Sequence, residues 1–175
     1  NLALYKSGEK AGNYTTRLWR SPGSGEFVLL PNFNNQDPVL RDLIRDLRFR
    51  QALSISINRE EFNDVINNGL AIPQQMTLAP WSKFVEPEFT TAYAEYDVEK
   101  ANALLDDIGL GWDQNHEYRL RPDGKRLTIR MEVSDVRRES PVELVTEYFR
   151  EVGVDLQMKA VSRDLKLQHF KTNEF

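Results

Sequence analysis

Apolar positions spaced three and four residues apart predict five helices along the chain. These helices cover about residues 39–57, 58–68, 97–109, 140–153 and 162–171. The last four begin at residues whose side-chain oxygen can accept a backbone N–H of the first turn. The capping residues are Asn58, Asp97, Ser140 and Ser162, and Glu61 follows Asn58 at the spacing of a capping box. Glycines at the expected ends, Gly69, Gly109 and Gly153, are typical of helix C-termini.

Alternating apolar and polar positions predict the strands. Residues 14–20 and 26–34 flank the turn SPGSG, residues 117–133 read as a hairpin around PDG, and residues 154–161 form a last strand. The order strand, helix, strand between 127 and 161 favours a parallel pair joined by a right-handed crossover. The pattern therefore predicts an α/β fold, preceded by the end of a helix and a loop in residues 1–13.

Residues 70–93 carry three prolines and little periodicity. A long irregular segment is uncommon inside a compact domain, and such loops often carry function. Trp81 lies in this segment directly after Pro80, and it either fills the core under the loop or forms the aromatic wall of a ligand cleft. Asn32 and Asn34 end an apolar strand, and their amides either face a cleft or begin the turn NNQDP.

Composition narrows the function classes. The 175 residues suffice for a core without disulfides, and the chain has no cysteine, which excludes a thiolate zinc site. A net charge of −4 argues against a general nucleic-acid binder. The sequence has no apolar run of about 18 residues, so we expect no membrane insertion.

No arrangement of residues predicts catalysis, a metal or a cofactor. His116 and His169 lack metal-ligand spacing and are interpreted as surface histidines. The acid pairs at 60–61 and 106–107 point apart on their helices and are interpreted as solvated charges. A basic cluster follows the hairpin and is interpreted as a polar face in solvent: Arg119, Arg121, Lys125, Arg126 and Arg130.

An ordered series of segments resembles the extracellular solute-binding proteins of ABC importers, family 5, which carry peptides, nickel chelates and some sugars. The segments are PNFN, RFRQALSISINREEF, NNGLAIP, YDVEKANALLDDIGL, DGKRLTIRMEV and ELVTEYFREVGVDL. They follow the family pattern across about residues 27–161. Asn58 stands where the family usually has Asp, and Val98 stands where it usually has Pro; either Asn or Asp can cap the helix.

The resemblance implies one lobe of a periplasmic-binding-protein type II fold, a mixed β-sheet flanked by helices. Residues 1–175 would be a single lobe of a longer, two-lobed, hinged protein. Residues 1–25 would be an entry segment and strand, 26–161 the family match, and 162–175 a terminal helix that ends before the chain returns to the cleft. Ligand would be held at the cleft by Leu30, Asn32, Asn34, Pro80, Trp81, Ser134 and Asp135. The last two follow a strand, where open α/β sheets bind ligands.

The resemblance also implies the setting of the protein. We expect the substrate-binding component of an ABC importer, an extracytoplasmic monomer in the periplasm or at the cell surface, with a signal peptide outside this sequence. Its partners would be an oligopeptide or similar small solute and a membrane permease, without nucleic acid, metal or cofactor. The alternative is the ligand-sensing domain of a transcriptional regulator built on the same lobe, and an enzyme on a similar scaffold is disfavoured because a nucleophile–base set is missing.

Overall fold

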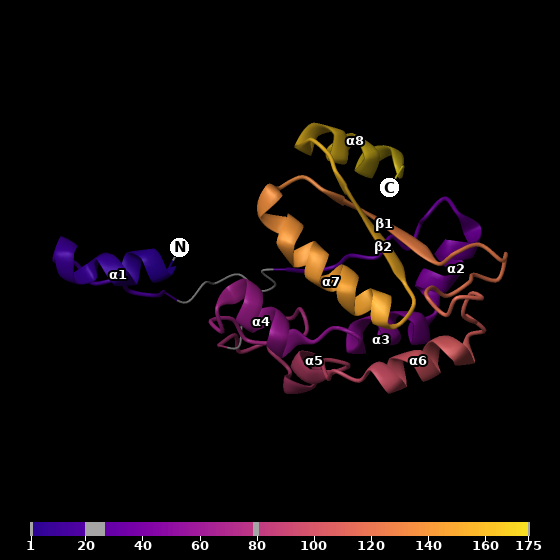
Figure 1. The fold of residues 1–175 in the computed structure, drawn as a ribbon, viewed down its shortest axis with the longest axis horizontal. Coiled ribbons are helices and arrows are strands. Elements are labelled where there is room, and N and C mark those ends of the chain that lie inside the picture. The colour runs from indigo at the N-terminus through magenta and orange to yellow at the C-terminus, as the bar shows by residue number, and fades with distance from the viewer. Residues whose placement is uncertain (1, 20–26, 79–80, 175) are drawn as a thin grey trace.

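The computed structural model of the chain describes residues 2–19, 27–78 and 81–174, and Figure 1 shows their arrangement. Helices are the main regular elements of the described residues. They are α1 (Leu2–Gly12), α2 (Pro38–Arg45), α3 (Leu47–Ile55), α4 (Arg59–Asn67), α5 (Pro87–Thr91), α6 (Val98–Asp107), α7 (Glu139–Glu151) and α8 (Arg163–Thr172). The strands are β1 (Thr128–Val133) and β2 (Asp155–Ala160), and a short 3-10 turn, Val136–Arg138, precedes α7.

The two strands form a parallel pair with α7 as the crossover, as the sequence predicts. Thr128 pairs with Asp155 at one end and Val133 with Ala160 at the other. Met131 packs against the core, whereas the next side chain, Glu132, points to the opposite face and meets α8. Helix α7 thus packs against the strand pair and α8 meets β1 at Glu132, which gives an α/β arrangement (Figure 1).

The core forms where α2, α3, α6 and α7 pack together under the sheet. Their apolar stripes supply fully buried side chains such as Phe49, Ile55, Leu105 and Val142. Burying one such side chain stabilises the fold by about 1.5–3 kcal/mol relative to leaving it in water. The helical periodicity of the sequence thus identifies the core-facing side of these helices correctly.

Most of the predicted caps are confirmed. The side chains of Asn58, Asp97 and Ser162 each accept a backbone N–H of the helix that follows, at 2.8–3.2 Å. The carboxylate of Glu61 accepts the hydroxyl of Tyr148 at 3.0 Å and so joins α4 to α7, a contact that the capping-box pattern does not predict. Burial and this contact with Glu61 raise the pKa of the Tyr148 hydroxyl.

Two helix boundaries differ from the prediction. The helix predicted at 39–57 is broken at Asp46, whose backbone is extended and whose carboxylate accepts the N–H of Arg48 at 2.8 Å, so that Asp46 ends α2 and caps α3. Ser140 does not cap α7, because the 3-10 turn starts the helix earlier, at Glu139. The short helix α5 lies within 70–93, where no regular element was predicted.

The early strands are also not formed as predicted. Residues 14–19 pair with no strand and fold back on α1, where the N–H of Thr16 donates to Glu9 at 2.8 Å. Residues 27–32 run extended without a ladder partner, with Phe27 and Leu29 packed against the core. The alternation in this segment reflects one buried face, which an extended chain can have without hydrogen-bonded neighbours. The turn SPGSG lies outside the described residues.

The predicted hairpin is reduced to its turn. Gly124 has a left-handed φ of 78° and donates its N–H to Arg121 at 2.8 Å, and a single antiparallel bridge links Leu120 to Arg126. The segment that follows pairs with β2 instead of extending the hairpin. Residues 128–133 therefore form a strand, as the alternating pattern predicts, but this strand pairs in parallel with β2 and is not an arm of a hairpin.

The interpretation of the basic cluster as a face in solvent is wrong for two of its members. Arg119 is fully buried, and Arg121 is 9% exposed and held between Asp37 and Asp123. Asp106 is 61% exposed, as its interpretation as a solvated charge requires, and it also lies 2.6 Å from the guanidinium of Arg119. The surface interpretation also fails for His169, whose side chain is mostly buried and lies 2.7 Å from Glu132.

Candidate functional site: an open hollow beside the sheet

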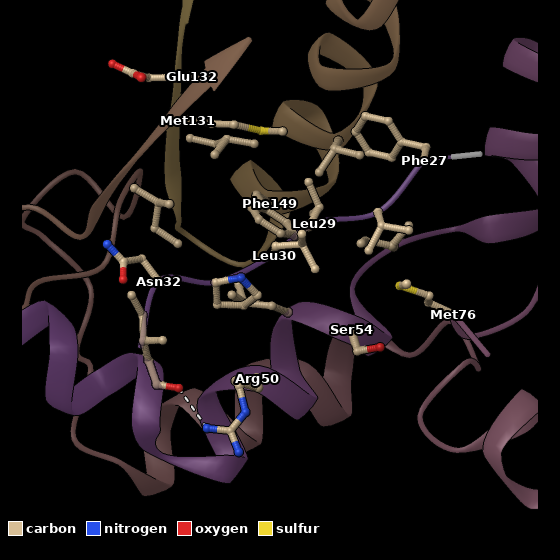
Figure 2. Close-up of a pocket in the computed structure, with 18 of the residues that line it drawn as sticks. Phe27, Leu29, Leu30, Asn32, Arg50, Ser54, Met76, Met131, Glu132 and Phe149 are labelled. Atoms are coloured by element: carbon tan, nitrogen blue, oxygen red, sulfur yellow. Dashed lines mark hydrogen bonds between the residues drawn. The ribbon is translucent and has the colours of Figure 1, made fainter. Parts of the chain in front are cut away.

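A large open hollow lies between β1, residues 27–36, α3 and the residues that follow α4 (Figure 2). Its volume is about 2500 Å³. A closed pocket for one small molecule has about 300–1,000 Å³. The hollow is therefore a broad concave surface that could take an extended ligand.

Leu30 lies on the extended segment at the edge of this hollow. Its side chain is 80% exposed, while its neighbour Leu29 packs against the core. The alternation of an extended chain explains this pair, because successive side chains point to opposite sides. Leu30 consequently presents an apolar side chain on the open side of the hollow, and its role in binding a ligand stays a prediction.

Asn32 and Asn34 line the hollow, and both take part in bonds within the chain. The side-chain oxygen of Asn32 accepts the N–H of Asn34 at 3.0 Å, which is the local bond of an Asx turn. Its amide nitrogen donates to Asn173 at 2.9 Å, and Asn173 donates in return to the backbone oxygen of Asn34 at 2.6 Å. These contacts favour the turn interpretation, and they fasten the turn to the C-terminal end of α8.

Two arginines hold the same turn from the side of α2 and α3. Arg45 donates to the backbone oxygen of Phe33 at 2.9 Å, and the guanidinium of Arg50 lies 5.0 Å from the centre of the Phe33 ring. Arg50 also donates to the oxygens of Ile44 and Arg45 at the end of α2, at 2.7 and 2.8 Å. Arg50 lines the hollow and brings a positive charge to it (Figure 2).

Trp81 contributes an aromatic surface to the hollow. Its side chain is 51% exposed and is one of the lining residues, so it does not fill the core under the loop. An indole offers a large rigid contact area at little entropic cost, which suits an apolar wall. Pro80, the neighbour that the sequence analysis assigns to the same wall, lies outside the described residues.

A polar cluster around Ser54 holds the loop that carries Trp81, and the sequence analysis did not identify it. The hydroxyl of Ser54 accepts bonds from Arg59 at 2.8 Å and from Gln75 at 2.7 Å, and it donates to the oxygen of Tyr93 at 2.7 Å. Burial lowers the pKa of the Arg59 guanidinium, which Glu95 partly opposes. The only signal in the sequence is a serine and an arginine at the corner of two helices, and that pattern does not identify their partners in residues 75–93.

Ser134 and Asp135 do not line the hollow. Ser134 is exposed, and Asp135 is held by Arg137, whose guanidinium contacts the carboxylate at 2.7–3.1 Å. The bonds from Arg137 lower the pKa of Asp135 to about 2. Both residues follow β1 as predicted, but the turn before α7 directs them away from the other candidate residues.

Glu132 is one of the carboxylates that line the hollow. One of its oxygens lies 2.7 Å from His169, and the other is buried without a hydrogen-bond partner among the described residues.

In the described part of the chain, no group of three or more His, Asp or Glu side chains could hold a metal ion. Among the described helices, none combines the length and apolar character needed to cross a bilayer.

The comparisons with known proteins agree on one family. The family model "Bacterial extracellular solute-binding proteins, family 5 Middle" matches residues 2–175. An oligopeptide-binding protein OppA of Lactococcus lactis subsp. lactis is 27% identical over 160 residues, which are 90% of this chain and 26% of the relative. The chain thus spans about a quarter of the length of this relative.

Solved structures show the same relationship. A structure of an oligopeptide-binding protein OppA is 43% identical, with a TM-score of 0.80 over 82% of this chain and 23% of its own. A lactococcal OppA, complexed with an endogenous peptide in the closed conformation, is 26% identical, with a TM-score of 0.62 over 74% of this chain and 25% of its own. The architecture is thus the periplasmic-binding-protein type II lobe that the resemblance implies. The chain belongs to the bacterial extracellular solute-binding proteins of family 5, which are transport proteins rather than enzymes.

Proposed function

We propose that the protein containing this chain is the substrate-binding component of an ABC importer. It captures an oligopeptide between two hinged lobes outside the cytoplasm and delivers it to a membrane permease. Hinged closure around a ligand is the mechanism by which periplasmic binding proteins work. The family and the peptide-binding relatives support this function, and the protein acts as a monomer without catalysis.

The observation that carries the proposal is the exposed apolar lining of the hollow. Leu30, Met76 and Trp81 line it and are each at least half exposed, although apolar side chains of this size lose stabilisation when they stay in water. A ligand that is enclosed against these side chains removes them from water. A peptide supplies both apolar side chains and a backbone that can bond to polar groups.

Within this proposal, the seven candidate residues divide by role. Leu30 and Trp81 contact the ligand, and Asn32 and Asn34 shape the turn that presents Leu30. Pro80 is expected to complete the wall beside Trp81. We assign Ser134 and Asp135 no direct contact, because they do not line the hollow.

Trp81→Ala in the complete receptor tests the function. Calorimetric titration with a synthetic pentapeptide and a nonapeptide should show at least about tenfold weaker binding, corresponding to about 1.4 kcal/mol of lost contact. The unfolding curve should change little, because Trp81 is half exposed.

Phe84→Ala is the matched control. Phe84 lies in the same loop and is 69% exposed, but it does not line the hollow. Its substitution should leave peptide affinity unchanged. Unaltered affinity in Trp81→Ala, or an equal loss in both variants, would contradict the assignment of the hollow as the peptide site.

A further inference from the structure

Gln75, which lines the hollow, bonds to several groups that are far from it in the sequence. Its side-chain nitrogen lies 2.7 Å from the hydroxyl of Ser54, 2.8 Å from the oxygen of Ala92 and 2.9 Å from the oxygen of Tyr93. Its backbone N–H donates to the oxygen of Thr90 at 2.9 Å. One residue thus bonds to α3 and to the chain at the end of α5.

These bonds satisfy groups that would otherwise lack partners. A carboxamide has two N–H donors, so the three acceptors around Gln75 share them. The oxygens of Thr90 and Ala92 belong to the C-terminal end of α5, where helical carbonyls have no partner in their own helix. Tyr93 has a left-handed φ of 54°, an uncommon conformation for a residue with a side chain. The bonds to its oxygen from Gln75 and Ser54 hold this conformation in place.

The same bonds close the base of a loop. We define the Trp81 loop as residues 76–78 and 81–89. Gln75 directly precedes this loop, and its partners at 90, 92 and 93 directly follow it. Loops whose ends are held close together in this way are compact and frequently functional. Ser54 then fastens the closed base to α3, which belongs to the core.

We propose that Gln75 is a positioning residue for ligand binding. Its side chain holds the base of the Trp81 loop against α3 and so presents Trp81 to the hollow before ligand arrives. A loop that is ordered in advance loses less conformational entropy when it binds. The inference rests on the proposed function, since it takes Trp81 to be a ligand contact.

Gln75→Leu in the complete receptor is the first test. It keeps much of the side-chain volume and removes both donors. We expect about tenfold weaker binding of the pentapeptide and nonapeptide, the loss that corresponds to one or two net hydrogen bonds. Gln75→Asn keeps the amide on a shorter side chain. If Gln75→Leu does not fold, Gln75→Asn takes its place in the test and should also bind both peptides more weakly. Gln168→Leu is the control, because Gln168 is an exposed glutamine on α8 outside the hollow.

A double-mutant cycle separates positioning from general destabilisation. If Gln75 acts through Trp81, adding Gln75→Leu to Trp81→Ala should cause no further loss of affinity. Additive losses in the double variant would overturn the proposal, as would unchanged affinity in both Gln75 variants.

Hydrogen exchange supplies a readout that does not depend on ligand. In Gln75→Leu, amide hydrogen exchange should speed up at residue 75 and in the Trp81 loop, and it should stay unchanged in α7 and β2. If the loop loosens but Trp81→Ala leaves affinity intact, the peptide site is wrongly assigned while the role of Gln75 in holding the loop stands. Unchanged exchange in the loop would overturn the role of Gln75 itself.

Discussion

Arg119 is the largest fully buried side chain among the described residues, and its guanidinium joins three parts of the fold. It donates to the oxygen of Val152 at 2.9 Å, to the oxygen of Leu110, and to the side chain of Asn102 at 2.8 Å. Its plane lies over the ring of Trp112, 4.8 Å from the centre. The residue thus supplies donors to the backbone oxygens of Leu110, which follows α6, and Val152, which follows α7, and both bonds are buried.

Arg119→Met should be among the most destabilising single changes in this chain. The substitution keeps a long side chain but leaves buried oxygens without donors, at a cost of about 3–5 kcal/mol in the free energy of unfolding. Urea denaturation followed by circular dichroism measures it. Arg163→Met, an exposed arginine on α8, is the control and should change the midpoint little. A loss no larger than the control's would show that the buried bonds of Arg119 are dispensable.

At this scale, sequence predicts local contacts and misses distant ones. Asn58 and Asp97 are recognisable as caps because the donors they satisfy lie three residues away. The partners of Arg119 lie 9 to 33 residues away, so residue type alone suggested a charge in solvent. Gln75 and Ser54 were missed for the same reason, since Tyr93 is far from both in the sequence.

Among elements, the break between α2 and α3 shows how a polar residue overrides periodicity. The apolar stripe continues through residue 46 in helical phase, which predicted one helix over 39–57. The carboxylate of Asp46 instead accepts the N–H of Arg48 in the first turn of α3, and Arg50 folds back to donate to the last oxygens of α2. Both helices then pack their stripes on the same core at an angle that a straight helix would not allow.

Asp37 links α2 to the turn around Gly124 and makes stability depend on pH. Its carboxylate caps α2 at Val39 and Leu40, at 3.0 and 3.2 Å, and lies 2.7 Å from the buried guanidinium of Arg121. The bond from Arg121 holds the pKa of Asp37 below its usual range. Since the folded state favours the ionised carboxylate, the stabilisation is complete above the unfolded pKa of about 4 and is lost as pH falls through the lower folded pKa.

Asp37→Asn should remove this pH dependence while leaving part of the cap. The gap in unfolding midpoint between the parent chain and the variant should be widest near about pH 6 and should shrink below about pH 4. Urea titrations at several pH values measure the gap. Asp64→Asn, an exposed aspartate outside the ion pairs of the described residues, is the control. A gap for Asp37→Asn that stays constant with pH would argue against the contact with Arg121.

For the whole molecule, the parallel strand pair was predictable and the hollow was not. The strand–helix–strand order fixes the handedness and the pairing of β1 and β2. The hollow depends on how residues 27–36 and 70–76 pass beside α3, and neither segment has a regular pattern that predicts its path. The family resemblance assigned Leu30 and Trp81 to an open surface, whereas their residue types alone are equally compatible with burial.

The chain spans 26% of the length of the lactococcal relative, and its apolar hollow is open on one side. If a second lobe closes over the ligand, the 175-residue chain alone makes only part of the contacts. Losing about 4 kcal/mol of binding free energy weakens affinity by a factor of about a thousand.

We therefore expect the isolated chain to bind the pentapeptide and nonapeptide at least about a thousandfold more weakly than the complete receptor, as calorimetry can measure. Circular dichroism and tryptophan fluorescence should report coincident urea transitions, which would show that the weak binding comes from a folded chain. Binding by the isolated folded chain as tight as by the receptor would mean that the hollow alone holds the peptide. Closure by a second lobe would then add no binding energy, and the two-lobed capture proposed for this protein would be wrong.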